Sequence, residues 1–287
     1  MDKKGDLPVS DAHGVASFLE KIERDSRSRP TFDLMSASDF ARKPVRLSTG
    51  SAPERLICVP ALLALCGPQQ FARFGQGFRG IRETLVLHIP GFVGEERLPA
   101  SLDIAIAYQV SAVEAAIGRD SPLILAGYSS GGIFAYGLAS QLEARGREVS
   151  AVVLLDTYPP RPDGVRTKPE AAAVQHLLSN REWRHYLNET RLTAMGWYLR
   201  VIAALDLRQV MAPTLLLRAR QPMAAVDGDD WRASWPFPHE ASDVPGDHYS
   251  MIELHARTAA QTVESWLRLK LAGSAQNVEL DQRSAAA

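Results

Sequence analysis

Short apolar runs alternate with longer helical patterns over most of the chain. Five runs end in Gly, Pro or a polar residue, and each has the length and composition of a strand that is buried on both faces. They are RLICVPAL from residue 55, TLVLHIPG from 84, PLILAGYS from 122, AVVLLDTYPP from 151 and PTLLLRARQP from 213. Strands of this kind are typical of a parallel sheet that is covered by helices on both sides.

Helical patterns fill the spaces between these strands. They are PQQFARFGQGF from residue 68, LDIAIAYQVSAVEAAI from 102 and GGIFAYGLASQLEARG from 131, and Gly146 stands where a glycine commonly ends a helix. Alternating strands and helices connect by right-handed crossovers. The sequence therefore predicts an α/β fold with a mostly parallel, doubly wound sheet.

The first 50 residues follow a different pattern. Val15, Phe18, Leu19 and Ile22 recur at the spacing of one helix face, with Ser10 or Asp11 available as its cap. A second, shorter helix is expected at 36–42. We therefore predict that residues 1–50 form an N-terminal helical extension and that residues 51–271 form the main domain.

Residues 167–205 interrupt the alternation with helical signals and no strand. This segment contains Trp183, Tyr186 and Trp197. Insertions of this kind often act as lids, so we predict a helical lid, the alternative being a helical excursion that only packs on the sheet. Residues 272–287 are small and polar and are predicted to be a disordered tail.

Composition and charge exclude several classes of protein. The 287 residues suffice for one large domain, and 46% hydrophobic residues support a sizeable core. The net charge of −1 gives no basic field for nucleic acid or anionic lipid. Without a signal-peptide pattern or an apolar run of about 20 residues, a cytoplasmic protein with no membrane contact is expected. Cys58 and Cys66 lie in apolar sequence and are predicted to be buried thiols.

The pattern Gly127-Tyr128-Ser129-Ser130-Gly131 matches G-x-S-x-G. By itself this pattern is weak, and the alternative is a glycine-rich turn without chemistry. Here a predicted strand precedes it and a predicted helix follows, which is the context of the sharp turn that exposes a nucleophilic serine in α/β-hydrolases. The pattern therefore predicts an α/β-hydrolase fold with Ser129 as nucleophile and the backbone N–H of Ser130 as an oxyanion donor.

A serine nucleophile needs a base, and in this fold the chain order is Ser, then Asp or Glu, then His. His13 and His88 precede Ser129 and break that order. His248 lies in a glycine-containing loop after the strand-like segment HEASDVPG, where a base can reach the serine, and it is the predicted base. The other histidines lie in the insertion, at the start of that segment or in the last helix; they are His176, His185, His239 and His255.

Two acids could orient that histidine. Asp156 directly follows the run AVVLL, whereas Asp227 lies one strand later in the loop VDGDD, which also fits a solvated turn. We favour Asp156 because its place at a strand end is more tightly specified. The second oxyanion donor is expected from Ala61 or Leu62, in the loop after the first core strand.

Several segments together resemble the terminal thioesterase domains of modular polyketide synthases. The similar segments cover residues 53 to 269 and are CGPQQFARFGQGFRG, PGFVGEERLPASL, LLDTYPP, TRLTAMGWY and WPFPHEASDVPGDHYSMIELHA. The resemblance supports Asp156 as the acid and implies that the Leu62 amide is the second oxyanion donor. The chain departs from the family at Ala61, where glycine is common, and at Leu62, where a small polar residue is common.

The resemblance also implies a reaction and partners. Such domains take a linear polyketide acyl chain from the phosphopantetheine arm of an acyl carrier protein onto the serine, then release it by hydrolysis or macrolactonisation, which the sequence leaves open. It further implies a substrate channel under the lid and a possible homodimer through N-terminal helices. No metal or organic cofactor is expected. The candidate channel residues are Tyr128, Trp183, Tyr186, Trp197 and Tyr249.

Three other functions compete with chain release. A discrete editing thioesterase would share the fold and the triad, but it has no need of an N-terminal helical extension. A free esterase or lipase would cleave simple oxygen esters without a carrier protein. A binding module on this fold would have no need of serine, histidine and aspartate in the hydrolase order.

Overall fold

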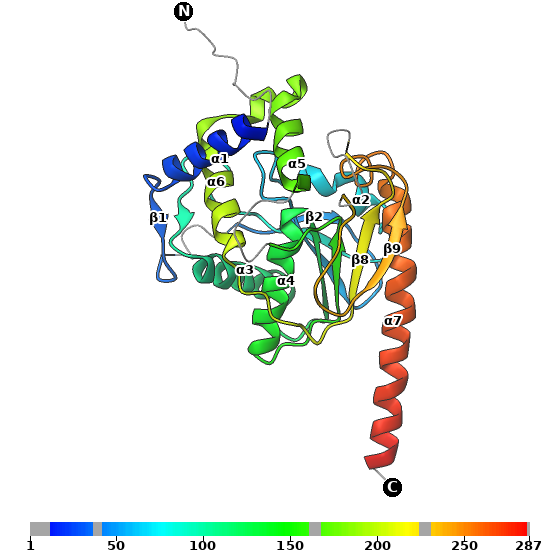
Figure 1. Ribbon diagram of the computed structural model, residues 1–287. Helices are drawn as coiled ribbons and strands as arrows, with labels where there is room; N and C mark the ends of the chain where they lie inside the picture. The colour runs from blue at the N-terminus through cyan, green and yellow to red at the C-terminus, as the bar shows by residue number, and fades with distance from the viewer. Residues whose placement is uncertain (1–11, 37–41, 161–167, 224–230, 286–287) are drawn as a thin grey trace, which may run out of the picture.

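The computed structural model describes residues 12–36, 42–160, 168–223 and 231–285. Their centre is a seven-stranded sheet in the order β2-β4-β3-β6-β7-β8-β9. Every neighbouring pair is parallel except β2 and β4, which are antiparallel. Figure 1 shows this sheet between the helices, and the predicted α/β architecture is confirmed.

The predicted strands form where the sequence placed them, five of them in the apolar runs and β9 in the strand-like segment HEASDVPG. They are β3 (Arg55–Val59), β4 (Thr84–Val86), β6 (Leu123–Tyr128), β7 (Ala151–Leu155), β8 (Thr214–Ala219) and β9 (Glu240–Val244). In β6 and β7 every residue is buried, as expected of strands in the middle of a parallel sheet. β9 lies at one edge, and four of its five residues are exposed or half-buried.

The edge strand β2 (Val45–Ser48) was not predicted and falls inside the expected helical extension. Three of its four residues are exposed or half-buried, so it has no apolar run to mark it. β1 (Thr31–Phe32) and β5 (Leu98–Pro99), which form a separate parallel pair, were not predicted either, because two residues are too few to show a strand pattern. The helix expected at 36–42 lies almost wholly outside the described residues.

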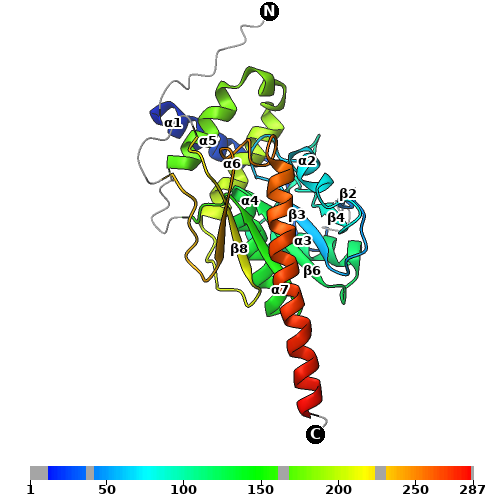
Figure 2. The same ribbon diagram turned by 90° about the vertical axis from the view of Figure 1, so that its right-hand side faces the viewer.

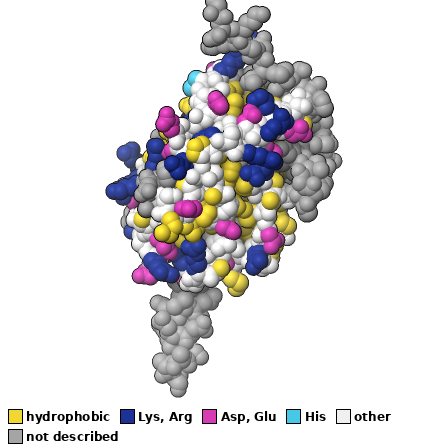
Figure 3. All heavy atoms as spheres, turned by 90° about the vertical axis from the view of Figure 1, so that its left-hand side faces the viewer, with side chains coloured by type: hydrophobic (Ala, Val, Ile, Leu, Met, Phe, Trp, Pro, Cys, Tyr) yellow, Lys and Arg dark blue, Asp and Glu magenta, His cyan; other side chains and the backbone are white. Residues whose placement is uncertain are grey.

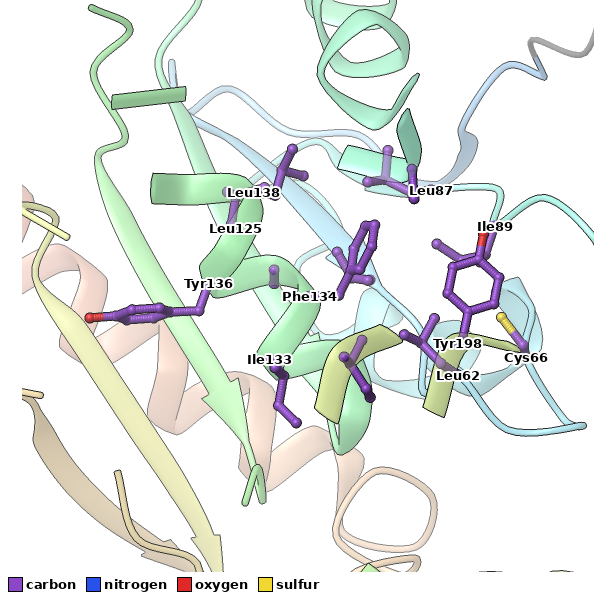
Figure 4. Close-up of a cluster of buried hydrophobic side chains, with 14 of the residues drawn as sticks. Leu62, Cys66, Leu87, Ile89, Leu125, Ile133, Phe134, Tyr136, Leu138 and Tyr198 are labelled. Atoms are coloured by element: carbon purple, nitrogen blue, oxygen red, sulfur yellow. The ribbon is translucent and has the colours of Figure 1, made fainter. Parts of the chain in front are cut away.

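Two hydrophobic cores lie on opposite faces of the sheet. Successive residues of β3 alternate between them, because side chains of a strand point to opposite faces in turn: Ile57 and Val59 belong to one core, and Leu56 and Cys58 to the other. The first core is covered by helices that include α3 (Leu102–Ile117) and α4 (Ser130–Ala144), and Figure 4 shows a part of it.

The second core is covered by α2 (Ala72–Gln76), the preceding 3₁₀ helix η2 (Pro68–Phe71) and the long helix α7 (Ala256–Ala285). Figure 2 shows α7 crossing this face of the sheet. Cys58 and Cys66 are both buried free thiols, as predicted. The helix α7 continues to Ala285, where the sequence suggested a disordered tail; Ala, Leu, Glu and Gln in that segment are good helix formers.

The insertion between β7 and β8 is helical, as predicted. It consists of α5 (Lys168–Ser179), the 3₁₀ helix η3 (Arg181–Tyr186) and α6 (Glu189–Ala203). The N-terminal helix α1 (Ala12–Ser26) packs on α6 and α5. Its apolar stripe is buried there at Val15, Leu19 and Ile22. The stripe is therefore occupied within one chain, and the expected dimer stays a prediction.

The surface on the α1 side carries side chains of mixed character. Figure 3 shows positive, negative and apolar side chains side by side among the residues that it colours. This agrees with the near-zero net charge of the chain. In the part of the chain that the structure describes, no helix has both the length and the apolar character needed to cross a bilayer.

The contact between α1 and α6 depends on Gly196. A Cβ built there would lie 2.6 Å from the backbone C and O atoms of Ile22, so the two helices would have to separate. We expect Gly196→Ala to lower the free energy of unfolding by about 1–3 kcal/mol, as overpacking does. The measurement is urea unfolding followed by tryptophan fluorescence.

Gly137→Ala is the matched control for this prediction. Gly137 is also helical, but a Cβ there would approach the flexible end of Leu205 at 3.0 Å and make an ordinary contact with Ile106 at 3.8 Å. Both substitutions gain the same helix propensity of about 1 kcal/mol, so their difference isolates the helix contact. Equal stability of the two variants would contradict the prediction.

Candidate active site

Ser129 occupies a sharp turn between strand and helix. β6 ends at Tyr128 and α4 begins at Ser130, so a single residue makes the turn. Its backbone has φ 55° and ψ −128°, which is a strained conformation for a residue with a side chain. The Ser129 N–H donates to the carbonyl of Leu155 on the next strand, at 2.9 Å. The turn places the serine at the carboxyl edge of the sheet.

The glycines of the motif are required by close backbone approaches. A Cβ on Gly127 would lie 2.4 Å from the carbonyl oxygen of Gly131. A Cβ on Gly131 would lie 2.4 Å from the carbonyl oxygen of Pro60, in the loop after β3. The motif thus packs the turn, the helix and the neighbouring loop together without room for side chains.

His248 and Asp156 meet at the same edge of the sheet. His248 lies in the loop after β9, and Asp156 directly follows β7. The imidazole Nδ1 is 2.8 Å from Asp156 Oδ2, and both side chains are almost completely buried, at 3% and 2% exposed. Asp156 has φ 44°, a conformation that aspartate tolerates better than most residues. Its other oxygen, Oδ1, accepts from the Ala219 N–H at 2.9 Å, which fixes the orientation of the carboxylate.

Tyr128 joins the serine turn to the histidine loop. Its hydroxyl donates to the backbone carbonyl of His248 at 2.8 Å, and the two rings stack with centroids 4.9 Å apart. Burial raises the pKa of this hydroxyl well above its ordinary value, so it stays a donor. Among the described residues no hydrogen bond joins the Ser129 hydroxyl to the imidazole; the bond from Tyr128, the residue before Ser129, links the serine turn to the histidine loop.

The loop after β3 donates a hydrogen bond from a backbone amide to the serine turn. The Leu62 N–H donates to the Ser130 hydroxyl at 2.9 Å, whereas the Ala61 N–H donates to Gln70 Oε1 at 2.8 Å. Of the two candidate donors, the Leu62 amide is the one directed at the serine turn. Arg191 of α6 holds the same loop by donating to the carbonyls of Ala64, at 2.7 Å, and Cys66, at 3.2 Å.

Three of the five candidate channel residues lie around His248. Tyr128, Trp183 and Tyr249 line one cavity together with the histidine. The Tyr249 hydroxyl also donates to the carbonyl of Ala173 on α5, at 2.9 Å, and the His176 ring stacks on it. The histidine loop is thereby tied to the helical insertion.

The other two candidate channel residues are placed elsewhere. Trp197 is 3% exposed and packs in the hydrophobic core, because its face of α6 points inward. Tyr186 lies under the guanidinium of Arg191, 5.2 Å from its ring centroid. Neither lines the cavities at Ser129 and His248. Trp183 and Tyr186 are half-buried and Trp197 is buried, and the sequence does not say which space an aromatic side chain of the insertion borders.

Tyr158 was not identified from the sequence. Its hydroxyl is 3.3 Å from Asp156 Oδ2 and 2.7 Å from the carbonyl of Trp231. Burial and then the nearby Asp156 charge raise the pKa of this hydroxyl, so it remains protonated beside the carboxylate. Its position two residues after the acid was the only available signal. Within the described residues, no cluster of three His, Cys, Asp or Glu side chains could hold a metal ion.

Comparisons with known proteins identify a family model and relatives that match most of this chain. A family model described as a thioesterase domain matches residues 54–267. The chain is 39% identical over 257 residues to polyketide synthase GfsE of Streptomyces halstedii, with 87% of this chain and 7% of that protein covered. It is 35% identical over 254 residues to erythronolide synthase EryA3 of Saccharopolyspora erythraea, covering 88% and 8%. The chain spans less than a tenth of the length of these two relatives.

Solved structures share the fold at low sequence identity. The thioesterase domain of NocB, in a covalent complex with a fluorophosphonate nocardicin G analogue, has a TM-score of 0.59 at 20% identity, with 77% of this chain and 98% of that chain covered. The type II thioesterase YbtT has a TM-score of 0.56 at 19% identity, covering 78% and 97%. The fold is therefore that of the α/β-hydrolase thioesterase domains.

Proposed function

The chain belongs to the thioesterase domain family, and we propose that it releases acyl chains from a polyketide synthase. It transfers the chain from the phosphopantetheine thioester of an acyl carrier protein to Ser129 and then releases it. The observation that carries this proposal is the buried 2.8 Å contact between His248 and Asp156 at the sheet edge where Ser129 makes its strained turn. Serine, aspartate and histidine in this order suit acyl transfer.

The first half of the reaction forms an acyl-enzyme. The Ser129 Oγ attacks the thioester carbon while His248 Nε2 takes its proton, and Asp156 holds the Nδ1–H and stabilises the imidazolium. The N–H groups of Leu62 and Ser130 stabilise the oxyanion. When the carbon–sulfur bond breaks, the imidazolium returns the proton to the departing sulfur, so a thiol leaves. In this proposal Ser129 supplies the nucleophile, His248 supplies the base, and Asp156 with the two backbone N–H groups stabilises the charges that develop.

The second half releases the chain. Water or a hydroxyl of the chain itself attacks the acyl-serine, and His248 takes its proton and passes it to Ser129. Water yields a linear acid, and the internal hydroxyl yields a macrolactone. The relatives at 35–39% identity are polyketide synthases, which supports chain release over a free editing enzyme or an unrelated esterase.

Intact-protein mass spectrometry tests this function. The protein is incubated with a long-chain hydroxyacyl thioester of N-acetylcysteamine, and the acyl adduct is mapped by proteolysis. We expect an adduct on Ser129 that resolves to a linear acid or to a ring, and the product distinguishes hydrolysis from macrolactonisation. If neither this thioester nor a fluorophosphonate probe labels Ser129, the proposed function is wrong.

The Ser130 hydroxyl competes with the substrate for the Leu62 amide. In the resting site it accepts that N–H at 2.9 Å, so the developing oxyanion must displace it. A neutral hydrogen bond contributes about 0.5–1.5 kcal/mol, which corresponds to about 2- to 12-fold in rate. We expect Ser130→Ala to raise kcat/KM by up to about tenfold in a thiol-release assay.

Ser130→Thr is the control, because it keeps a hydroxyl at the same position. Its kcat/KM is expected to stay within about twofold of the wild type. A loss of more than tenfold in the alanine variant, rescued by threonine, would show instead that the hydroxyl assists the reaction.

A further inference from the structure

Two small cavities border the candidate active site. One has a volume of about 20 Å³ and includes Ser129 among its lining residues; the other, of about 50 Å³, includes His248. Leu63 lines both. Its side chain is 8% exposed and belongs to the first hydrophobic core, on the face of the sheet that α3 and α4 cover. The two key side chains of the proposed reaction thus open into separate spaces that share one wall.

Both cavities are too small for a substrate as they stand. A cavity of about 10–15 Å³ holds one water molecule, and pockets for small ligands usually have about 300–1,000 Å³. Part of each wall comes from the helical insertion: Ala173 and Val174 of α5 line the first cavity, and Trp183 of η3 lines the second. Because the insertion forms part of each wall, an outward movement of the insertion would enlarge both cavities.

Building on the proposed function, we propose that Leu63 separates two subsites for a thioester substrate. The cavity at His248 receives the thiol-bearing arm of the donor, and the cavity at Ser129 receives the acyl chain. Leu63 stands between them beside the reacting carbonyl and limits the substituents that the acyl chain can carry there.

The direction follows from the proton that the leaving group needs. When the carbon–sulfur bond breaks, the sulfur must take its proton from His248, so it has to lie on the histidine side. The acyl group remains bonded to Ser129 and extends from the serine side. The opposite placement would carry the sulfur away from its acid.

The chemistry of the His248 cavity suits an arm built of amides and methylenes. Trp183 and Tyr249 offer aromatic faces, with ring centroids 5.6 Å apart. Gln70 accepts the Ala61 N–H with its oxygen, so its NH₂ group is what it can offer to a ligand carbonyl. The exposed Glu253 can accept from a ligand N–H. A pantetheine-like arm alternates methylene segments, which can pack on the aromatic faces, with amides, which can pair with Gln70 and Glu253.

The Ser129 cavity has the character of an acyl site. Apart from Ser129, Ser130 and Tyr158, its lining is apolar: Leu63, Ile133, Ala173, Val174 and Leu199. These residues come from the loop after β3, from α4 and from both long helices of the insertion. Such a surface binds hydrocarbon by the area it removes from water, and it favours longer chains.

Leu63 follows the residue whose amide faces the serine turn. The Leu62 N–H and Ser130 hydroxyl are 2.9 Å apart, so the carbonyl carbon of a bound substrate would lie close to the next side chain. A substituent on the carbon beside that carbonyl would contact Leu63. One methylene in a hydrophobic pocket changes selectivity by about 10- to 200-fold.

Two pairs of substrates separate the two subsites. Octanoyl-pantetheine and octanoyl-N-acetylcysteamine have similar alkyl thiols but different arm lengths. The arm ratio is therefore defined as kcat/KM for the pantetheine thioester divided by kcat/KM for the N-acetylcysteamine thioester. The acyl ratio is defined as kcat/KM for the octanoyl thioester of pantetheine divided by kcat/KM for its butyryl thioester, and it reports on binding of the acyl chain. Thiol release is measured for the wild type, Trp183→Ala, Val174→Phe and, as a control, Arg181→Ala, an exposed neighbour of Trp183 that lines neither cavity.

We expect Trp183→Ala to lower the arm ratio about fivefold and to leave the acyl ratio unchanged. Val174→Phe should lower the acyl ratio about tenfold and leave the arm ratio unchanged, with the smaller change Val174→Leu giving the same direction if the phenylalanine variant does not fold. Exchanged effects, equal effects on both ratios, or a wild-type arm ratio of one would overturn the proposal. Absence of turnover with all substrates and of a phosphonate adduct on Ser129 would instead reject the proposed function.

Leu63→Ala tests the divider itself. Its ratio of kcat/KM for a 2-methyloctanoyl over an octanoyl thioester should rise about tenfold relative to the wild type. Leu63→Met, which retains most of the volume, should leave that ratio within about threefold. An unchanged ratio in the alanine variant, with octanoyl turnover retained, would show that Leu63 does not border the carbonyl.

Discussion

Replacement of Ser129 by alanine is expected to lower kcat for thioester cleavage by about 10⁶-fold, the loss found when the serine of a catalytic triad is removed. In the proposed mechanism, His248 and Asp156 have nothing to activate without the hydroxyl, so only the oxyanion donors and substrate binding remain. Thiol release gives the rate, and intact-protein mass spectrometry should show no acyl adduct. Both measurements address the same side chain independently.

The variant should fold normally, which makes the result interpretable. Alanine has the same Cβ as serine, so the strain at φ 55° is unchanged, and the backbone hydrogen bond to Leu155 does not involve the side chain. Ser130→Ala, one residue away, is the matched control and should retain the adduct. An acyl adduct trapped on the Ser129→Ala protein would rule out Ser129 as the nucleophile.

The second large effect is expected at Asp156. Asp156→Asn should reduce kcat about 10⁴-fold while the structure is retained. The Ala219 N–H needs an oxygen at the Oδ1 position, so the asparagine amide must turn its NH₂ toward His248 Nδ1. That nitrogen must then accept a hydrogen bond, and the proton moves to Nε2, which can no longer act as base. Single-turnover acylation rates measure this loss.

Asp227→Asn is the matched control for the acid. Asp227 was the alternative acid in the sequence and lies outside the described residues, and its substitution is expected to leave kcat within about twofold. A large loss in Asp227→Asn together with near-normal Asp156→Asn would reverse the assignment. Equal unfolding free energies of the two proteins would exclude a difference in folding as the cause.

Much of the fold followed from the local pattern of apolar residues. The buried strands β3, β6, β7 and β8 are continuous apolar runs because both their faces are covered, and such runs are visible in any single sequence. The edge strand β2 escaped prediction because it is mostly exposed and its residues alternate without an apolar run. Its place in the sheet depends on pairing with β4, which is a contact between segments that are far apart in the chain.

Some residues of the candidate site also had a local signal in the sequence, and others had none. Ser129 was identified by the glycines around it, and their presence has a local cause, since side chains at Gly127 and Gly131 would collide with backbone atoms. Asp156 and His248 were chosen by chain order and by their places after strands, and the structure brings them to 2.8 Å. Leu63, Gln70 and Arg191 carry no such local signal, because leucine, glutamine and arginine occur at many positions without bordering a site.

By itself, then, the sequence determined the order of the buried strands and of the helices between them, the strained serine turn and the residue types that the proposed chemistry needs. These are properties of short segments, set by side-chain periodicity and by where glycine is indispensable. Only the tertiary structure decided that Leu63 borders both cavities, that Trp197 is core rather than lining, and that α1 covers its apolar stripe on α6. Those features arise from packing between distant segments, and packing depends on three-dimensional shape, which no local pattern records.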